Sequence, residues 1–241
     1  MNDLQPIRTV LGDQIDDLVA TEHGYVVLVG HIIDFTSVPE LIWVSSRGEV
    51  LQKARLPGDP LTDRIRYGAL PLRIGPDGLV WSGTHDALLG FGADGQLRRQ
   101  VALELDSTEK ICSFVAQPDG FVVSAFAPGS RRPRAKVLRV SMDGLTRWQT
   151  ELPVPDDVNH WDGHPKEPLL ISGNCVLTSY FDVSGGFGNS FGLNLDDGAV
   201  RFKTTPRTLG NLAISGNESF LLGVQGYGRF HTEEIDGAGR C

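Results

Sequence analysis

The chain has few of the residues that mark several large classes of protein. Its three cysteines are Cys112, Cys175 and Cys241, and no two of them form a Cys-x-x-Cys pair, so neither a structural zinc site nor a redox motif is supported. No apolar run is long enough to span a membrane, and no basic segment followed by an apolar one opens the chain. We therefore expect no signal peptide, and the low, odd number of cysteines favours a cytoplasmic protein.

A basic surface is also missing. The 241 residues include 22 Lys and Arg against 30 Asp and Glu, which gives a net charge of −8. Proteins that bind nucleic acid need a basic footprint for the phosphates. We therefore expect no nucleic-acid partner and no membrane association. The 40% of hydrophobic residues is ordinary for a globular domain with a sizeable core.

The motifs of common enzyme classes do not occur. The chain has no His-Glu-x-x-His, no Gly-x-Ser-x-Gly and no P-loop. His160 and His164 are four residues apart, but Gly163 and Pro165 beside them argue against the helix that would align the two rings. The segment 157–163 resembles a calcium loop, yet its spacing is off by one residue and no Glu stands at the twelfth place. We expect no metal and no cofactor, and we name no catalytic residue.

What the sequence does have is a repeat. A short apolar run that follows a tight turn recurs with starts at Gly24, Gly78, Gly120, Asn174 and Ser219. The starts are separated by 54, 42, 54 and 45 residues. A period of roughly 40–50 residues built from short strands is typical of a β-propeller. The sequence therefore predicts an all-β fold of about five four-stranded antiparallel blades.

Each unit is expected to hold four strands, a to d, with a innermost. In the third unit these are Ile111–Ala116, Phe121–Ala127, Ala135–Ser141 and Leu145–Leu152, and Asp-Gly pairs stand between a and b and between c and d. Strands a and b are nearly continuous apolar runs, as expected for strands covered on both faces. The blades are expected at about 14–58, 67–105, 110–153, 166–206 and 210–241 of a single domain, 1–241.

The fifth unit offers no strand d after Phe230–Asp236. A segment near the start of the chain, Gln5–Asp13, resembles strands d of other units, and we expect residues 5–12 to close the fifth blade and cover its open edge. The other interpretation is that the chain is a fragment of a larger, six- to eight-bladed propeller.

The repeats resemble the superfamily of pyrroloquinoline-quinone-like and WD40-like propellers. The best match is Asp143-Gly144-Leu-Thr-Arg-Trp148, which is similar to the Gly-x-x-x-Trp hairpin of quinoprotein repeats, whereas Gln52, Arg99 and Phe202 replace the Trp in other units. The resemblance implies the propeller fold. It implies no catalytic residue, because the adjacent cysteines of quinone enzymes are absent.

The connections between strands are uneven. Those from a to b and from c to d are short, whereas those from b to c and from d to a vary and are often long. Binding residues gather on loops that a rigid scaffold holds. We therefore predict a non-catalytic propeller that binds a protein or peptide partner through the long loops. The candidate binding residues are Phe35, Tyr67, His85, Arg131, Arg132, Arg134, His160, Trp161, Tyr180, Phe187 and Tyr227.

Two further points stay open. Arg131, Arg132, Arg134 and Lys136 form a basic cluster, which suits a carboxylate or an acidic protein.

The alternative function is an enzyme of the hydrolase or lyase type that acts on a small molecule or a glycan with polar residues around a central channel. The candidates for that role are Asp16, Asp17, Lys110, Glu167 and Asn211. The oligomeric state is not predicted.

Overall fold

The structure is a computed structural model, and it describes residues 15–29, 39–57, 71–84, 86–127, 134–152, 169–182, 187–204, 208–226 and 229–240. Within these ranges, only the backbone is described at 134, 179–182, 187–189, 208–213, 222–226 and 229–231. All regular secondary structure in the described part of the chain is β-strand. The segment that was expected to close the fifth blade, residues 5–12, lies outside it.

The described strands form five sheets. In chain order they are β1 (Ile15–Thr21), β2 (Gly24–Val29), β3 (Glu40–Ser45), β4 (Val50–Arg55), β5 (Arg73–Ile74), β6 (Val80–Gly83), β7 (Ala87–Phe91), β8 (Leu97–Ala102), β9 (Lys110–Gln117), β10 (Gly120–Ala127), β11 (Arg134–Ser141), β12 (Thr146–Leu152), β13 (Leu170–Ser172), β14 (Cys175–Asp182), β15 (Phe187–Asn194), β16 (Val200–Lys203), β17 (Thr208–Gly216), β18 (Ser219–Gly226) and β19 (Arg229–Asp236).

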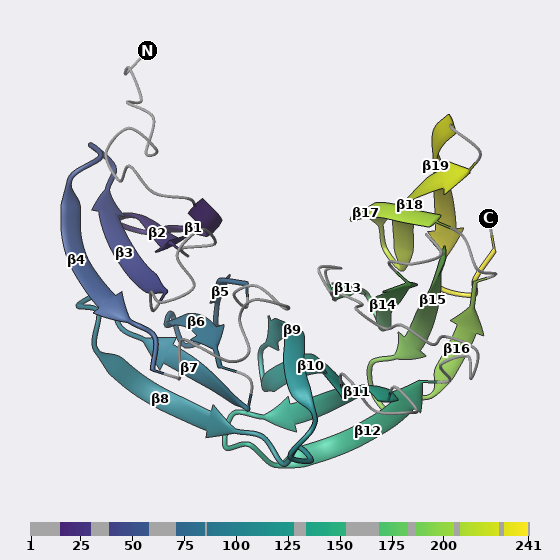
Figure 1. Ribbon diagram of the computed structural model, residues 1–241, viewed down its shortest axis with the longest axis horizontal. Coiled ribbons are helices and arrows are strands. Elements are labelled where there is room, and N and C mark those ends of the chain that lie inside the picture. Colours follow the sequence, from purple (N-terminus) through teal and green to yellow (C-terminus); the bar gives the residue numbers. More distant parts are fainter. Residues whose placement is uncertain are drawn as a thin grey trace. The chain divides into compact units, whose positions relative to one another are not determined.

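Each sheet is an antiparallel meander of strands that follow one another along the chain (Figure 1). Four sheets have four strands: β1–β4, β5–β8, β9–β12 and β13–β16. The fifth, β17–β18–β19, has three described strands. Since neighbouring strands in sequence are neighbours in the sheet, short hairpins suffice to connect them, and the predicted all-β repeat of four-stranded antiparallel sheets is confirmed.

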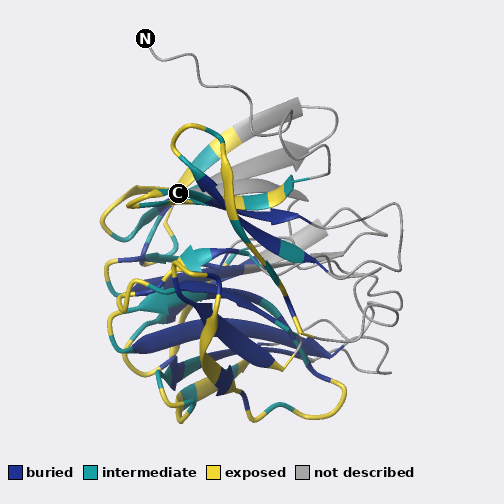
Figure 2. Ribbon diagram, turned by 90° about the vertical axis from the view of Figure 1, so that its left-hand side faces the viewer, coloured by how far each residue is buried: buried dark blue, intermediate teal, exposed yellow. Residues whose placement is uncertain are grey.

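Burial follows the position of a strand in its sheet (Figure 2). All eight residues of β10, a second strand, are buried, and β7, a third strand, is buried throughout. The fourth strands are mostly exposed; in β4 and β12 exposed and half-buried residues alternate along most of the strand. This is the expected difference between strands covered on both faces and edge strands with one face in water.

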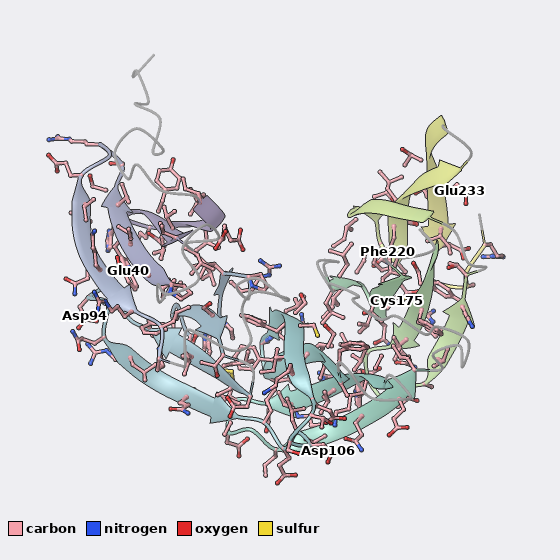
Figure 3. All side chains as sticks on the ribbon, in the orientation of Figure 1. Glu40, Asp94, Asp106, Cys175, Phe220 and Glu233 are labelled. Carbon is pink, nitrogen blue, oxygen red and sulfur yellow. The ribbon has the colours of Figure 1, made fainter. Side chains whose placement is uncertain are left out.

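The chain folds into two compact units. Residues 1–103 and 116–119 form the first, and residues 104–115 and 120–241 form the second. The core of the first includes Trp43 and Phe91, whose rings meet edge to face at 6.4 Å. In the second, Cys175 and Phe220 of two different sheets belong to one buried cluster, and both are labelled in Figure 3.

The turns between third and fourth strands share one construction. In four of the five, the residue that ends the third strand donates its N–H across the turn, as Ser141 does to the Leu145 carbonyl at 2.9 Å; after β7 the donor is Gly92, one residue beyond the strand. One residue of each fourth strand is then skipped in the pairing, which marks a β-bulge. The skipped residues are Leu51, Arg98, Arg147 and Arg201.

In three of the four bulged strands, the residue after the bulge contacts the next sheet. Trp148 packs against Gly198, where an added Cβ would lie 2.5 Å from its ring, and its Nε1–H donates to the Leu195 carbonyl at 2.9 Å. Gln52 lies in the same way against Gly95 in the first unit, and Phe202 lies against Gly239 in the second. Three of the four residues that stand at the Trp position of the repeat, Gln52, Trp148 and Phe202, thus contact the following sheet.

Candidate functional site

Every sheet has two ends with different connections. We call the end that carries the first-to-second and third-to-fourth connections the turn end. We call the opposite end, with the second-to-third connection and the link to the next sheet, the loop end. Turn-end connections are as short as residues 118–119 and 142–145, whereas the loop-end connections 30–39, 56–72 and 153–169 are long.

Most of the predicted binding residues belong to loop-end connections outside the described residues. These are Phe35, Tyr67, His85, Arg131, Arg132, His160, Trp161 and Tyr227. The backbone alone is described for Arg134, Tyr180 and Phe187. Their proposed role in binding therefore stays a prediction.

The structure does correct the extent of three loops. Arg134 is the first residue of β11 and pairs with Ala127, and Phe187 is the first residue of β15 and pairs with Asp182. In the fifth sheet the pairing continues to Arg229, so residues 227–228 alone connect β18 and β19. The sequence predicts loops over 128–134, 182–189 and 225–229, but antiparallel pairing extends into all three segments and shortens each loop.

The most deeply buried charges of the described residues lie at the loop end of the third sheet. Lys136 Nζ lies 2.6 Å from Glu109 Oε2, and the two side chains are 10% and 5% exposed. The same carboxylate oxygen accepts the Asp106 N–H at 2.9 Å, and the Glu109 N–H donates to the Asp106 carbonyl at 2.8 Å. Glu109 thereby joins the connection before β9 to a residue near the start of β11; Figure 3 labels Asp106 on that connection.

This pair changes the basic cluster that the sequence suggests. Lys136 is buried and its charge is compensated by the ion pair with Glu109, so it does not present a free charge to a partner. Lys136 therefore leaves the predicted basic cluster, and a role of Arg131, Arg132 and Arg134 in binding an acidic ligand stays a prediction. Sequence reasoning missed Glu109, and only its position directly before an apolar strand could have marked it as a buried partner.

A second polar contact lies at the loop end in the first unit. The carboxylate of Asp17 accepts the N–H of Leu18 and the N–H of Leu72, both at 2.8 Å. Arg73 Nη1 lies 3.6 Å from Asp17 Oδ2 and donates to the Leu72 carbonyl at 2.7 Å. Partial burial lowers the pKa of Arg73, and the nearby Asp17 charge opposes that shift. Asp17 thus joins β1 to the segment that enters β5.

These contacts bear on the alternative of an enzyme that uses polar residues of the innermost strands. Asp17 is occupied by two backbone N–H groups and Arg73, which suits a structural role better than proton transfer. The first strands, which the sequence predicts to be innermost, also expose large apolar side chains. These are Leu18 on β1, Ile74 on β5 and Ile214 on β17. Glu167 and the side chain of Asn211 lie outside the described residues.

Neither thiol of the described residues resembles a reactive cysteine. Cys175 is buried and Cys112 packs against a core cluster. Desolvation raises the pKa of both thiols, which disfavours the nucleophilic thiolate. Within the described ranges, no three His, Cys, Asp or Glu side chains gather as a metal site would require, and no helix is long and apolar enough to cross a membrane.

Comparisons with known proteins give a fold but no family. No protein-family model matches the chain, and no curated protein is similar to it in sequence. Among solved structures it is similar to the C-terminal domain of Pseudomonas aeruginosa PilY1, with 12% identity over 90% of this chain and 70% of that one and a TM-score of 0.58. A protein of unknown function from Bacteroides caccae has 14% identity over 95% and 80%, with a TM-score of 0.55.

The WD40 domain of Neurospora crassa Pan2 is also similar, with 9% identity, a TM-score of 0.52 and coverage of 98% of this chain and 65% of that one. Identities this low show the fold alone. Together with the five antiparallel meanders, they show that the chain has the β-propeller fold, with about five blades.

Proposed function

We propose that this propeller is a non-catalytic binding protein and that it recognises a protein or peptide partner with the loop ends of its blades. The observation that carries the proposal is the contrast between the two ends of the sheets. Short hydrogen-bonded turns close the turn ends, whereas the long connections and the candidate aromatic and arginine residues belong to the loop ends. Exposed Trp, Tyr and Arg are the residues that contribute most to protein interfaces.

Two further observations support binding over catalysis. Asp17, one of the carboxylates predicted for the enzyme alternative, accepts hydrogen bonds from two backbone N–H groups. Of the described thiols, Cys175 is buried and Cys112 is half-buried against a core cluster. A cytoplasmic location is part of the proposal, on the low, odd number of cysteines in the sequence.

The test is an affinity capture with matched variants. The full chain is immobilised as wild type, Trp161→Ala, Arg132→Ala and Arg47→Ala, and the proteins recovered from a cell extract are quantified by mass spectrometry. Arg47 is exposed in the turn between β3 and β4 and serves as the control at the turn end. We expect one set of proteins to be lost with both loop-end variants and retained with Arg47→Ala. Recovery that is equal for all four would overturn the proposal.

A second measurement tests the alternative function, that of a hydrolase or lyase. Purified partner is added at increasing concentration, and binding is followed by calorimetry in the absence of any other reagent. A binding protein gives a stable complex with unchanged components. A change in the mass of the partner on incubation would instead support a hydrolase or lyase and would refute a purely binding role.

A further inference from the structure

The outer edge of β4 combines exposed apolar and positively charged side chains. In the described part of the chain, β4 is the last strand of its sheet, and no other strand pairs with its far side (Figure 1). Its first two residues, Val50 and Leu51, are 42% and 56% exposed. Lys53 and Arg55 are exposed as well. An open strand edge is a template on which another extended chain can pair.

The hydrogen bonds between β3 and β4 show which backbone groups of β4 face away from β3. Leu56 N–H donates to the Pro39 carbonyl at 3.1 Å, and Glu40 stands opposite Arg55 in the next pair of the register. Pairs in an antiparallel ladder alternate between hydrogen-bonded and non-hydrogen-bonded, so Arg55 and Lys53 belong to pairs of the second kind. Their backbone N–H and carbonyl groups therefore point toward the open edge.

Both cations of this edge remain available to a partner. Among the described residues, Lys53 has no acidic partner. Arg55 Nε lies 3.2 Å from Glu40 Oε1, but the Arg55 side chain is still 78% exposed. An ion pair this exposed is weak, so it does not prevent Arg55 from binding another carboxylate. The edge of β4 therefore offers two positive charges in a chain whose net charge is −8.

The other outer strands lack this pair of charges. The residues one and three places after the Trp position of the repeat are Lys53 and Arg55 in β4, Gln100 and Ala102 in β8, and Gln149 and Glu151 in β12. In β16, Lys203 takes the first of these places, but its Nζ lies 5.6 Å from the centre of the Phe191 ring. Of β4, β8 and β12, only β4 has a cation at either place, so the charges do not follow from the repeat itself.

The charges also favour one kind of occupant. If β4 paired antiparallel with β4 of a second copy, the cations of the two strands would come next to each other, and like charges in such positions are destabilising. An acidic strand gains the opposite effect at both places. β4 begins with its two exposed apolar residues and ends with its two cations. An antiparallel peptide therefore presents its acidic residues first and an apolar residue after them.

We propose that the outer edge of β4 is a second binding surface, which takes up an acidic extended peptide as a fifth antiparallel strand of the first sheet. Two acidic residues separated by one residue stand opposite Arg55 and Lys53, and an apolar residue lies against Leu51. Main-chain hydrogen bonds at such an edge supply affinity, whereas the side chains supply selectivity. The inference does not depend on the proposed function of the loop end, which stands whether or not β4 binds a peptide.

The experiment follows a synthetic peptide, Thr-Glu-Thr-Glu-Thr-Leu-Thr with a fluorescent label, by anisotropy as the full chain is added at low salt. Lys53→Glu sets like charges opposite each other and is expected to weaken binding about five- to tenfold. Lys203→Glu makes the same change of charge at the same place of β16, and it should bind the peptide as wild type does. No binding to wild type, or equal losses for the two variants, would overturn the proposal.

N-methylated peptides separate strand pairing from charge attraction. In the proposed register, the N–H groups of the two glutamates donate to the carbonyls of Lys53 and Arg55, whereas those of the threonines beside them point away. Methylation of both glutamate nitrogens should weaken binding at least about tenfold, because two hydrogen bonds are lost, and methylation of two threonine nitrogens should do so far less. Equal losses would refute strand pairing. A dimer of the chain that the peptide dissociates would assign the edge to a second copy instead.

Discussion

The two ends of the sheets are built from different kinds of contact. At the turn end of the third and fourth sheets, Trp148 packs on Gly198, and the Thr150 hydroxyl donates to the Gly198 carbonyl at 2.6 Å. At the loop end of the third sheet, Lys136 and Glu109 bury opposite charges. Desolvation makes a buried ion pair a poor source of stability, and apolar residues of similar volume often do as well or better. The comparison indicates that the Trp148 contact at the turn end stabilises the junction of two sheets, whereas stability alone does not require the Lys136–Glu109 pair at the loop end.

The largest effect is expected from breaking the buried pair. Lys136→Met leaves the Glu109 carboxylate buried without its cation, and it should lower the free energy of unfolding by about 3–5 kcal/mol. Adding Glu109→Gln, which can still accept the Asp106 N–H, should recover most of that loss. Urea unfolding of the two variants and wild type measures both. If the double variant is as unstable as the single one, the pair contributes to stability more than the comparison allows.

Next in size is the loss of the indole at the turn end. Trp148 is half-buried, so Trp148→Ala should cost about 2–3 kcal/mol from lost packing and the lost hydrogen bond to Leu195. Trp148→Phe keeps a ring against Gly198 and gives up only the N–H, which should cost about 1 kcal/mol. Equal losses for the two variants in urea unfolding would mean that ring packing adds nothing.

Two glycines allow the packing contribution to be separated from backbone strain. Gly198 and Gly78 both have a φ of +74°, but an added Cβ meets Trp148 and Thr150 at Gly198 and nothing within 4 Å at Gly78. Gly78→Ala should therefore show the strain alone, about 1–2 kcal/mol. Gly198→Ala should lose about 1–3 kcal/mol more, because the indole must move. Equal losses, measured by thermal or urea unfolding, would contradict the tight contact between Trp148 and Gly198.

The smallest effect is a dependence on pH at the junction of the fourth and fifth sheets. Arg201 donates two hydrogen bonds to Glu218, at 3.2 and 3.1 Å, and these bonds with that of the Asn174 N–H lower the Glu218 pKa from its ordinary value of 4.5. A lowered pKa means that this stabilisation is full above pH 4.5 and is lost as the pH falls through the folded-state pKa. Glu218→Gln should flatten the fall of Tm below pH 4.5, and salt should weaken the wild-type effect. Identical acid profiles for both proteins would exclude this contribution.

Local sequence signals account well for the turn end. Asp-Gly and Asn-containing pairs place the hairpins, apolar runs place the buried second and third strands, and the Gly-x-x-x-Trp segment that ends at Trp148 marks the residue that contacts the next sheet. These features depend on neighbours within a few residues, so they can be predicted from the sequence alone.

The loop end depends on long-range contacts and was predicted less well. Lys136 looked like a member of an arginine cluster, because its partner Glu109 is distant in sequence and only the folded sheet brings them together. Asp17 looked like a channel residue, but its carboxylate accepts the N–H of Leu72, which lies directly before the next sheet. Phe187 and Arg229 looked like loop residues, although strand pairing continues through them.

The central claim is that partner binding belongs to the loop end, and the dissociation constant of the captured partner tests it most directly. The constant is measured for Trp161→Ala and Arg132→Ala at the loop end, and for Trp148→Phe and Arg47→Ala at the turn end. The account predicts at least about tenfold weaker binding for the first two, the loss expected when an interface anchor is removed, and wild-type affinity for the other two. Unchanged affinity of the loop-end variants together with weaker binding of the turn-end variants would contradict it.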